Sequence, residues 1–174
     1  MHLAVAPPDP FDTLAPVVHQ WCRRLARRGV DAEAVAQEVL LVLHRRRGEL
    51  RDGGSMQAWA WGITVRTLAA ESRRVWLRRW LPGPVPEGRV EADAARDLER
   101  HQLAERVRRV LDELNDAQRQ VLVLCDVESR PRAEVAELMG VPEGTLKSRL
   151  RLAREAFRRV ARRQGLDVPE VDDA

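Results

Sequence analysis

The stretch that decides the fold is Ala133-Glu-Val-Ala-Glu-Leu-Met-Gly140-Val-Pro-Glu-Gly-Thr-Leu-Lys-Ser-Arg-Leu150. Its first half predicts a short amphipathic helix, and Gly140 supplies a residue that can take the positive φ of a helix end. A second helix follows, on which apolar residues recur at alternating steps of four and three: Leu146, Leu150, Ala153, Phe157 and Val160. Two helices joined by so short a turn predict a helix-turn-helix.

The second of these helices is basic outside its apolar stripe. From Lys147 to Arg163 the chain has eight basic residues against one acid, Glu155. This bias suits a phosphate backbone, although a solvated helix of an Arg-rich protein would carry the same charge. The tight turn favours DNA binding, because this arrangement places the second helix in a major groove.

The apolar stripe also predicts which side chains meet DNA. If the stripe faces the core, Lys147, Ser148 and Arg151 share an outward face near the helix start, and we expect them to reach base edges. A second set is expected to contact mainly phosphate: Thr145, Arg149 and Arg154. The alternative is that all these cations are interchangeable phosphate ligands.

Length and composition allow one or two small domains, and no apolar run is long enough to span a membrane. Residues 1–11 lack the charged region and apolar core of a signal peptide, so we expect a cytoplasmic protein without membrane insertion. Cys22 and Cys125 lie far apart without C-x-x-C spacing, and the four histidines are scattered. No cofactor or metal site is therefore expected.

Three helices are predicted before residue 80. The first begins at Phe11 and ends at Gly29, and its apolar stripe is Phe11, Leu14, Val18, Trp21 and Leu25. The second covers residues 32–47 after a capping Asp31; it leaves Gln37 and Glu38 exposed and turns four residues inward: Val35, Val39, Val42 and Leu43. The third starts near Ser55, continues through Gly62 and ends at Pro82.

Residues 81–97 are rich in Pro, Gly and charge and predict a linker. The helix after it is expected to bury Leu103, Val107, Val110, Leu111 and Leu114. Asn115 and Gln118 then predict a capping box for the next helix. No strand pattern appears, so the expected fold is all-α with two small helical domains. The expected segments are an amino-terminal tail (1–10), a first domain (11–80), the linker (81–97), a second domain with the helix-turn-helix (98–163) and an acidic tail (164–174).

Residues 135–150 resemble the promoter-reading helix-turn-helix of domain four of bacterial sigma factors, and residues 114–119 look like its lead-in. In the other half, Asp31 to Leu40 is similar to the segment of sigma domain two that grips a coiled coil of the largest RNA polymerase subunit. Ala58 to Ile63, followed by Arg73-Arg74, looks like the helix that reads the minus-10 element. Together, residues 11–163 resemble an extracytoplasmic-function (ECF) sigma factor of the sigma-70 family.

The resemblance implies a function as well as a fold. It predicts a protein that is not an enzyme, binds core RNA polymerase through Gln37 and Glu38, and directs initiation by recognising minus-10 and minus-35 promoter DNA. The residues expected at the minus-10 element are Trp61, Arg66, Arg73 and Arg74. An anti-sigma factor is a further partner that the family commonly uses. The rival functions are a stand-alone helix-turn-helix regulator and a helical adaptor for acidic proteins; copurification with core polymerase separates both from a sigma factor.

Aromatic platforms beside cations would suit an unstacked promoter strand. Trp59 lies on the apolar stripe and is expected in the core, whereas Trp61 is the better candidate for exposure. The chain departs from the family pattern at five positions: Ala34 replaces an acid, Arg66 an Asn, Leu152 a basic residue, Ser129 a turn Gly and Pro131 a capping Ser.

Overall fold

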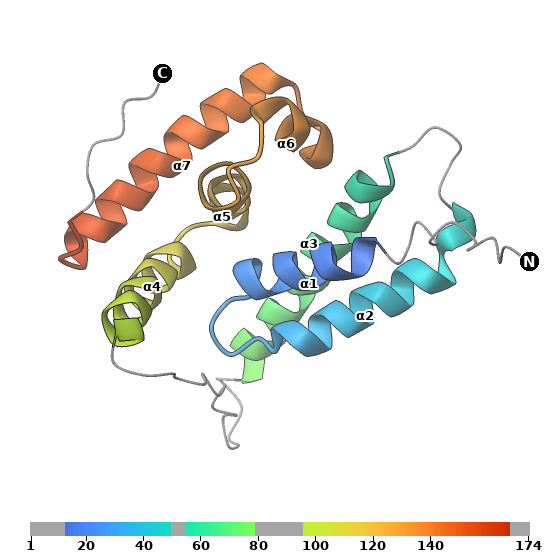
Figure 1. Cartoon of the computed structure of the whole chain (residues 1–174), viewed down its shortest axis with the longest axis horizontal. Coiled ribbons are helices and arrows are strands. Elements are labelled where there is room, and N and C mark those ends of the chain that lie inside the picture. Colours follow the sequence, from blue (N-terminus) through green and yellow to red (C-terminus); the bar gives the residue numbers. More distant parts are fainter. Residues whose placement is uncertain (1–12, 50–54, 79–95, 168–174) are drawn as a thin grey trace, which may run out of the picture. The chain divides into compact units, whose positions relative to one another are not determined.

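The computed structural model of the chain describes residues 13–49, 55–78 and 96–167. These residues form helices joined by short connections, and no strand occurs among them (Figure 1). The chain divides into two compact units, which we call the N-terminal unit (Met1–Ala26 and Val30–Gly83) and the C-terminal unit (Pro84–Ala174, joined by Arg27–Gly29). The expected all-α class with two small helical domains is confirmed.

The N-terminal unit is a packed set of three helices: α1 (Leu14–Leu25), α2 (Ala32–Arg45) and α3 (Met56–Arg78), with a short 3-10 turn, η1 (Arg47–Glu49), after α2. All three pack against one another, and α1 lies beside α2 in Figure 1. The largest fully buried side chain is Trp21 of α1. Its ring meets that of Trp61 edge to face, with centroids 5.1 Å apart. Such a pair adds attraction beyond the area it buries.

The ends of these helices follow local signals with one exception. The Asp31 side chain accepts hydrogen bonds from the backbone N–H groups of Glu33 and Ala34, which caps α2 as predicted. Helix α3 passes through Gly62 without a break. The predicted end of the first helix is wrong: Gly29 has a φ of 85°, but α1 already ends at Leu25. Phe11, its predicted start, lies outside the described residues.

The C-terminal unit contains α4 (Arg96–Asp112), α5 (Asp116–Leu122), α6 (Arg132–Met139) and α7 (Glu143–Arg163). A π-helical segment, η2 (Val123–Val127), continues α5. The long α7 packs against α4, α5 and α6, and α5 is seen end-on in Figure 1. The core of the C-terminal unit consists of aliphatic side chains from each helix, including Val110, Leu124, Val135 and Leu146.

Polar and backbone contacts fix the turns of this unit. Asn115 and Gln118 form the predicted capping box at the start of α5. Arg119 is 4% exposed and donates to Asp112 Oδ1 over 2.7 Å. Burial lowers the pKa of this guanidinium, and the Asp112 carboxylate opposes that shift.

Two sequence expectations for this unit need correction. Leu103 is 53% exposed, and among the residues of α4 whose burial is described, those that are buried lie in its last turns, at Val110 and Leu111. Leu166 falls within the predicted acidic tail but is only 6% exposed. The reason is a Schellman turn: Gly165 has a φ of 66°, and the Leu166 N–H donates to the Ala161 carbonyl over 2.9 Å. The linker prediction falls mostly outside the described residues, and α4 begins two residues inside it, at Arg96.

Candidate nucleic-acid interface

The helix-turn-helix forms where the sequence predicts it. Gly140 ends α6 with a φ of 64°, and the Val141 N–H donates to the Ala136 carbonyl over 3.0 Å. Pro142 then adopts an extended conformation (φ −59°, ψ 146°), and α7 begins at Glu143. Gly140 is required at this turn because a side chain is strained at positive φ. The turn therefore sets the direction in which α7 leaves α6.

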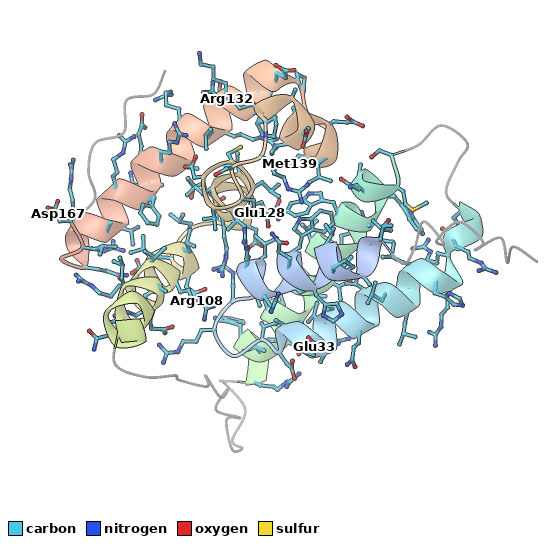
Figure 2. The ribbon with its side chains drawn as sticks, in the orientation of Figure 1. Glu33, Arg108, Glu128, Arg132, Met139 and Asp167 are labelled. Atoms are coloured by element: carbon cyan, nitrogen blue, oxygen red, sulfur yellow. The ribbon has the colours of Figure 1, made fainter. Side chains whose placement is uncertain are left out.

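The apolar stripe of α7 faces the unit's own core. Leu146, Leu150, Ala153 and Val160 are buried, and Phe157 is half-buried. Five of the predicted DNA contacts are exposed and form what we call the outward face of α7: Thr145, Lys147, Ser148, Arg149 and Arg151. In Figure 2, long side chains with nitrogen tips project from α7 away from the other helices of its unit.

The polar groups of the outward face differ in their partners. Within the part of the chain that the structure describes, Lys147 and Arg149 make no ion pair. The Ser148 hydroxyl donates to the Gly144 carbonyl over 3.0 Å. Arg151 pairs with Glu155, one turn further along the same helix. This pair is exposed on both sides, so it orients Arg151 more than it stabilises the fold.

Arg154 is placed differently from the prediction. Its guanidinium donates Nη2 to Asp126 Oδ1 over 2.8 Å and Nε to Asp126 Oδ2 over 3.1 Å. Asp126 belongs to η2, where the Glu128 N–H reaches back five residues to the Val123 carbonyl over 2.9 Å. The side chain of Arg154 is only 20% exposed. The bidentate pair ties η2 to α7 and engages this guanidinium within the unit.

A second cationic surface lies on α3, and we call it the outer stripe of α3. Arg66 and Arg73 are exposed there, at helical spacing from Gly62. The Arg66 guanidinium lies over Gly62, where a Cβ would come within 3.3 Å of Arg66 Nη1. Gly62 therefore gives the Arg66 side chain room to lie along the helix.

The last turns of α3 carry a shared acid. Glu71 accepts from Arg74 over 3.2 Å and from Arg78 over 2.9 Å. Both arginines are more than half exposed. Because Glu71 compensates part of their charge, the cationic character of the outer stripe is strongest at Arg66 and Arg73.

The expected exposure of the tryptophans is reversed. Trp61 is 3% exposed and packs on Trp21, so its ring presents no free face for a base. Trp59 is half-buried instead of lying in the core. The exposed ring of the described part of α3 is that of Trp76, at 57%. We therefore withdraw Trp61 from the set of DNA-contacting residues.

The face of α2 that resembles a polymerase-binding segment is exposed as expected. Gln37 and Glu38 both lie at the surface, while Val35 and Val39 on the other side of the helix are buried. Leu41, one turn after Gln37, is 55% exposed. Leu41 is not among the predicted contact residues, although an apolar residue one turn from two exposed polar residues is a signal that the sequence contains.

The cysteines lie apart from these surfaces. Cys22 is fully buried in α1, and burial, with a smaller contribution from Glu33, raises the pKa of its thiol to about 12. Burial also raises the pKa of the Cys125 thiol. Among the described residues, no group of three or more His, Cys, Asp or Glu is arranged to hold a metal ion, and no helix there is both long and apolar enough to cross a membrane.

Comparison with known proteins gives a family to both units. Residues 11–80 match the family model for sigma-70 region 2, and residues 104–157 match that for sigma-70 region 4. The ECF RNA polymerase sigma factor SigM of Mycobacterium tuberculosis is 29% identical over 82% of this chain and 70% of its own length. The ECF RNA polymerase sigma factor SigW of Bacillus subtilis is 24% identical over 88% of each chain.

Solved structures show the same fold. The sigma factor RpoE from Bartonella quintana, in complex with the anti-sigma factor NepR, matches with a TM-score of 0.63 at 20% identity, over 87% of this chain and 94% of its own. CnrH, in complex with the cytosolic domain of CnrY, matches with a TM-score of 0.61 at 18% identity, over 88% of each chain. Since the two family models match most of the chain in the order region 2 and then region 4, the chain belongs to the sigma-70 family and is an alternative, ECF-type sigma factor that directs transcription initiation.

Proposed function

We propose that this sigma factor binds core RNA polymerase through the exposed side of α2 and reads two promoter elements with separate units. The observation that carries the proposal is the outward face of α7, which is cationic and exposed on the second helix of a helix-turn-helix. The N-terminal unit would supply the polymerase contact and the minus-10 contact, and the C-terminal unit the minus-35 contact.

At the minus-35 element we assign two roles to the outward face of α7. Lys147, Ser148 and Arg151 would reach base edges, with Glu155 holding Arg151 in a fixed direction. Thr145 and Arg149 would contact phosphate. Arg154 is left out of both sets, because its guanidinium is paired with Asp126 and its side chain is only 20% exposed.

At the minus-10 element we assign Arg66, Arg73 and Arg74 to the DNA backbone and bases, in keeping with the family resemblance of α3. A captured single strand needs an exposed aromatic ring, and base stacking on such a ring contributes about 1 to 3 kcal/mol. The side chain of Trp76 is 57% exposed. We therefore propose Trp76 as the stacking platform in place of Trp61.

The proposed contact with core polymerase is tested on α2. Gln37→Ala with Glu38→Ala should weaken binding to core enzyme while the free energy of unfolding changes by no more than about 0.5 kcal/mol, as expected for exposed positions. A double substitution of two exposed residues elsewhere on α2, His44→Ala with Arg45→Ala, is the matched control. Unchanged affinity of the Gln37/Glu38 variant for core enzyme would refute this assignment.

The proposed reading of the promoter is tested by runoff transcription with core enzyme on a promoter library. Arg151→Ala should reduce transcription most at one base pair of the minus-35 element, by about 1 to 3 kcal/mol in discrimination, if it makes a bidentate contact with guanine. Arg149→Ala is the control, because loss of a phosphate ligand should weaken all sequences alike and lower the salt slope by about one. Uniform loss with both variants would show that the outward face acts only through charge.

An anti-sigma factor is a further proposed partner. Of the similar solved structures, RpoE is in complex with the anti-sigma factor NepR, and CnrH is in complex with the cytosolic domain of CnrY. We expect a protein of this kind to compete with core polymerase for this chain. Copurification of the chain from its own cells, with and without added core enzyme, would reveal that competition.

A further inference from the structure

Leu152 is an apolar residue in a cationic setting. It lies on α7 outside the buried stripe and is 49% exposed, whereas Leu146 and Leu150 of the same helix are buried. Leaving a large aliphatic side chain half in water forgoes part of the free energy that its burial would provide. A single exposed leucine is common on protein surfaces, but Leu152 lies on the side of α7 that carries the proposed DNA contacts.

Leu152 continues a line of short side chains along the helix. Thr145, Ser148 and Leu152 follow one another at steps of three and four, so they share one line on the surface of α7. The long cationic side chains flank this line, with Lys147 and Arg151 on one side and Arg149 on the other. A line of short side chains between longer ones is the part of a helix that comes nearest to the floor of a groove.

The charges around Leu152 indicate what it would meet there. Glu155 lies one turn further along α7, three residues from Leu152, and its carboxylate is about half exposed. The charge of a phosphate beside Leu152 would gain nothing from the aliphatic side chain, and Glu155, which is paired with Arg151, would offer it no attraction. A base edge carries no such charge.

The apolar group that base edges present in the major groove is the C5-methyl group of thymine. We propose that Leu152 contacts this methyl group in the minus-35 element and makes the chain prefer a T·A pair at one position. This inference rests on the proposed function of α7 in reading the minus-35 element. It makes Leu152 a specificity-determining residue of that element.

The test compares thymine with deoxyuridine, which differs only by the absent methyl group. Holoenzyme formed from the full chain and core RNA polymerase first selects its minus-35 element from a randomised duplex library. Each thymine of that element is then replaced by deoxyuridine in turn, and the dissociation constant of the holoenzyme is measured. At one thymine, we expect the replacement to weaken binding about three- to five-fold, the effect of one buried methyl group.

Variants of the chain attribute that methyl effect to residue 152. Leu152→Ala should bind the thymine duplex about as weakly as wild type binds the deoxyuridine duplex, and deoxyuridine should weaken it no further. Leu152→Lys should also lose the methyl effect and should steepen the salt dependence by about one phosphate contact. Leu103→Ala, which changes another exposed leucine of the same unit, should keep the full methyl effect.

Three outcomes would overturn the inference alone: a selected element without thymine, no thymine sensitive to deoxyuridine, or the same sensitivity in wild type and Leu152→Ala. Weakened binding of Leu152→Ala to core enzyme without DNA would overturn it as well, because Leu152 would then contact a protein. If the wild-type holoenzyme selects no minus-35 element at all, the proposed function of α7 fails and the inference fails with it.

Discussion

The two units of this chain are stabilised by different chemistry. The N-terminal unit buries Trp21 and Trp61 in contact with each other, together with aliphatic residues from all three helices. The described C-terminal unit buries no tryptophan; its core is aliphatic, and two arginines with little exposure, Arg119 and Arg154, are paired with acids. The first unit therefore depends on ring packing, and the second depends more on polar contacts between its elements.

This difference can be measured because the probes separate the units. All five tryptophans of the chain precede residue 84, so tryptophan fluorescence reports unfolding of the N-terminal unit. Far-ultraviolet circular dichroism reports the helices of both units. A transition seen by circular dichroism but not by fluorescence belongs to the C-terminal unit.

The largest expected effect is that of Trp61→Ala. Removing a buried ring from a packed pair should destabilise the N-terminal unit by about 3 to 5 kcal/mol and leave the C-terminal unit unchanged. Trp76→Ala, at an exposed position of the same helix, should change stability by no more than about 0.5 kcal/mol. Denaturant titration followed by fluorescence measures both. Equal effects of the two substitutions would contradict the placement of the rings.

The next effect is a loss of stability at alkaline pH. The ordinary pKa of a cysteine thiol is 9.0, and burial raises that of Cys22 to about 12. Between these values the unfolded chain releases a proton that the folded unit retains, so the free energy of unfolding should fall as pH rises, by up to about 1.4 kcal/mol per pH unit. Well below pH 9 the thiol is protonated in both states, so Cys22 causes no change in the free energy of unfolding there. Denaturant titrations of the N-terminal unit at pH 8 to 10.5 measure this slope.

Few other groups complicate that measurement. The chain has no tyrosine, and Lys147 is its one lysine. Cys22→Ala should remove the alkaline slope from the fluorescence transition, while Cys125→Ala should leave it in place. A slope that persists in Cys22→Ala would assign it to another group.

A smaller effect is expected from Arg154→Ala in the C-terminal unit. Loss of its bidentate pair with Asp126 should cost about 1 kcal/mol, because the pair has two hydrogen bonds and the Arg154 side chain is only 20% exposed. Arg151→Ala removes only an exposed pair within one helix and should cost less than about 0.5 kcal/mol. Thermal unfolding followed by circular dichroism compares the two. If Arg154→Ala were as mild as Arg151→Ala, the polar contacts would not distinguish this unit.

The smallest effect is a gain of stability at Ser129. This residue has a φ of 52°, a conformation that favours glycine, so Ser129→Gly should stabilise the C-terminal unit by about 0.5 kcal/mol. The reverse change at Gly140, whose φ is 64°, should destabilise the same unit. Thermal unfolding followed by circular dichroism, at equal protein concentration, measures both changes in stability. Destabilisation by Ser129→Gly would mean that the serine side chain contributes more than the backbone strain removes.

Regular spacing explains why α7 was predicted well. Its apolar stripe recurs at steps of three and four among mostly basic residues, and Leu152 is the one large apolar residue outside it, so the sequence indicates one face for burial. Helix α3 lacks that regularity. From Trp59 to Val65 it is apolar or small on nearly every side, so hydrophobicity did not fix which face turns inward, and the prediction for Trp59 and Trp61 was reversed.

Other features required the tertiary structure. Asp126 and Arg154 lie 28 residues apart, and no local spacing indicates that they meet. Leu166 lies among polar and acidic residues, and its burial depends on the turn at Gly165. Caps such as Asp31 and Asn115 were predicted correctly because each acts within three residues of itself.

The π-helical segment η2 makes the C-terminal unit sensitive to deletions at one place. A π turn is equivalent to an α-helix into which a single residue has been inserted, and here that turn precedes the residues that lead into α6. Removing one residue between Val123 and Val127 would restore an uninterrupted α-helix. It would also rotate Asp126 by about a quarter of a turn away from Arg154. A substitution at one of these positions changes one side chain. A single-codon deletion instead moves Asp126 out of line with Arg154, and these two residues form the ion pair that holds η2 to α7.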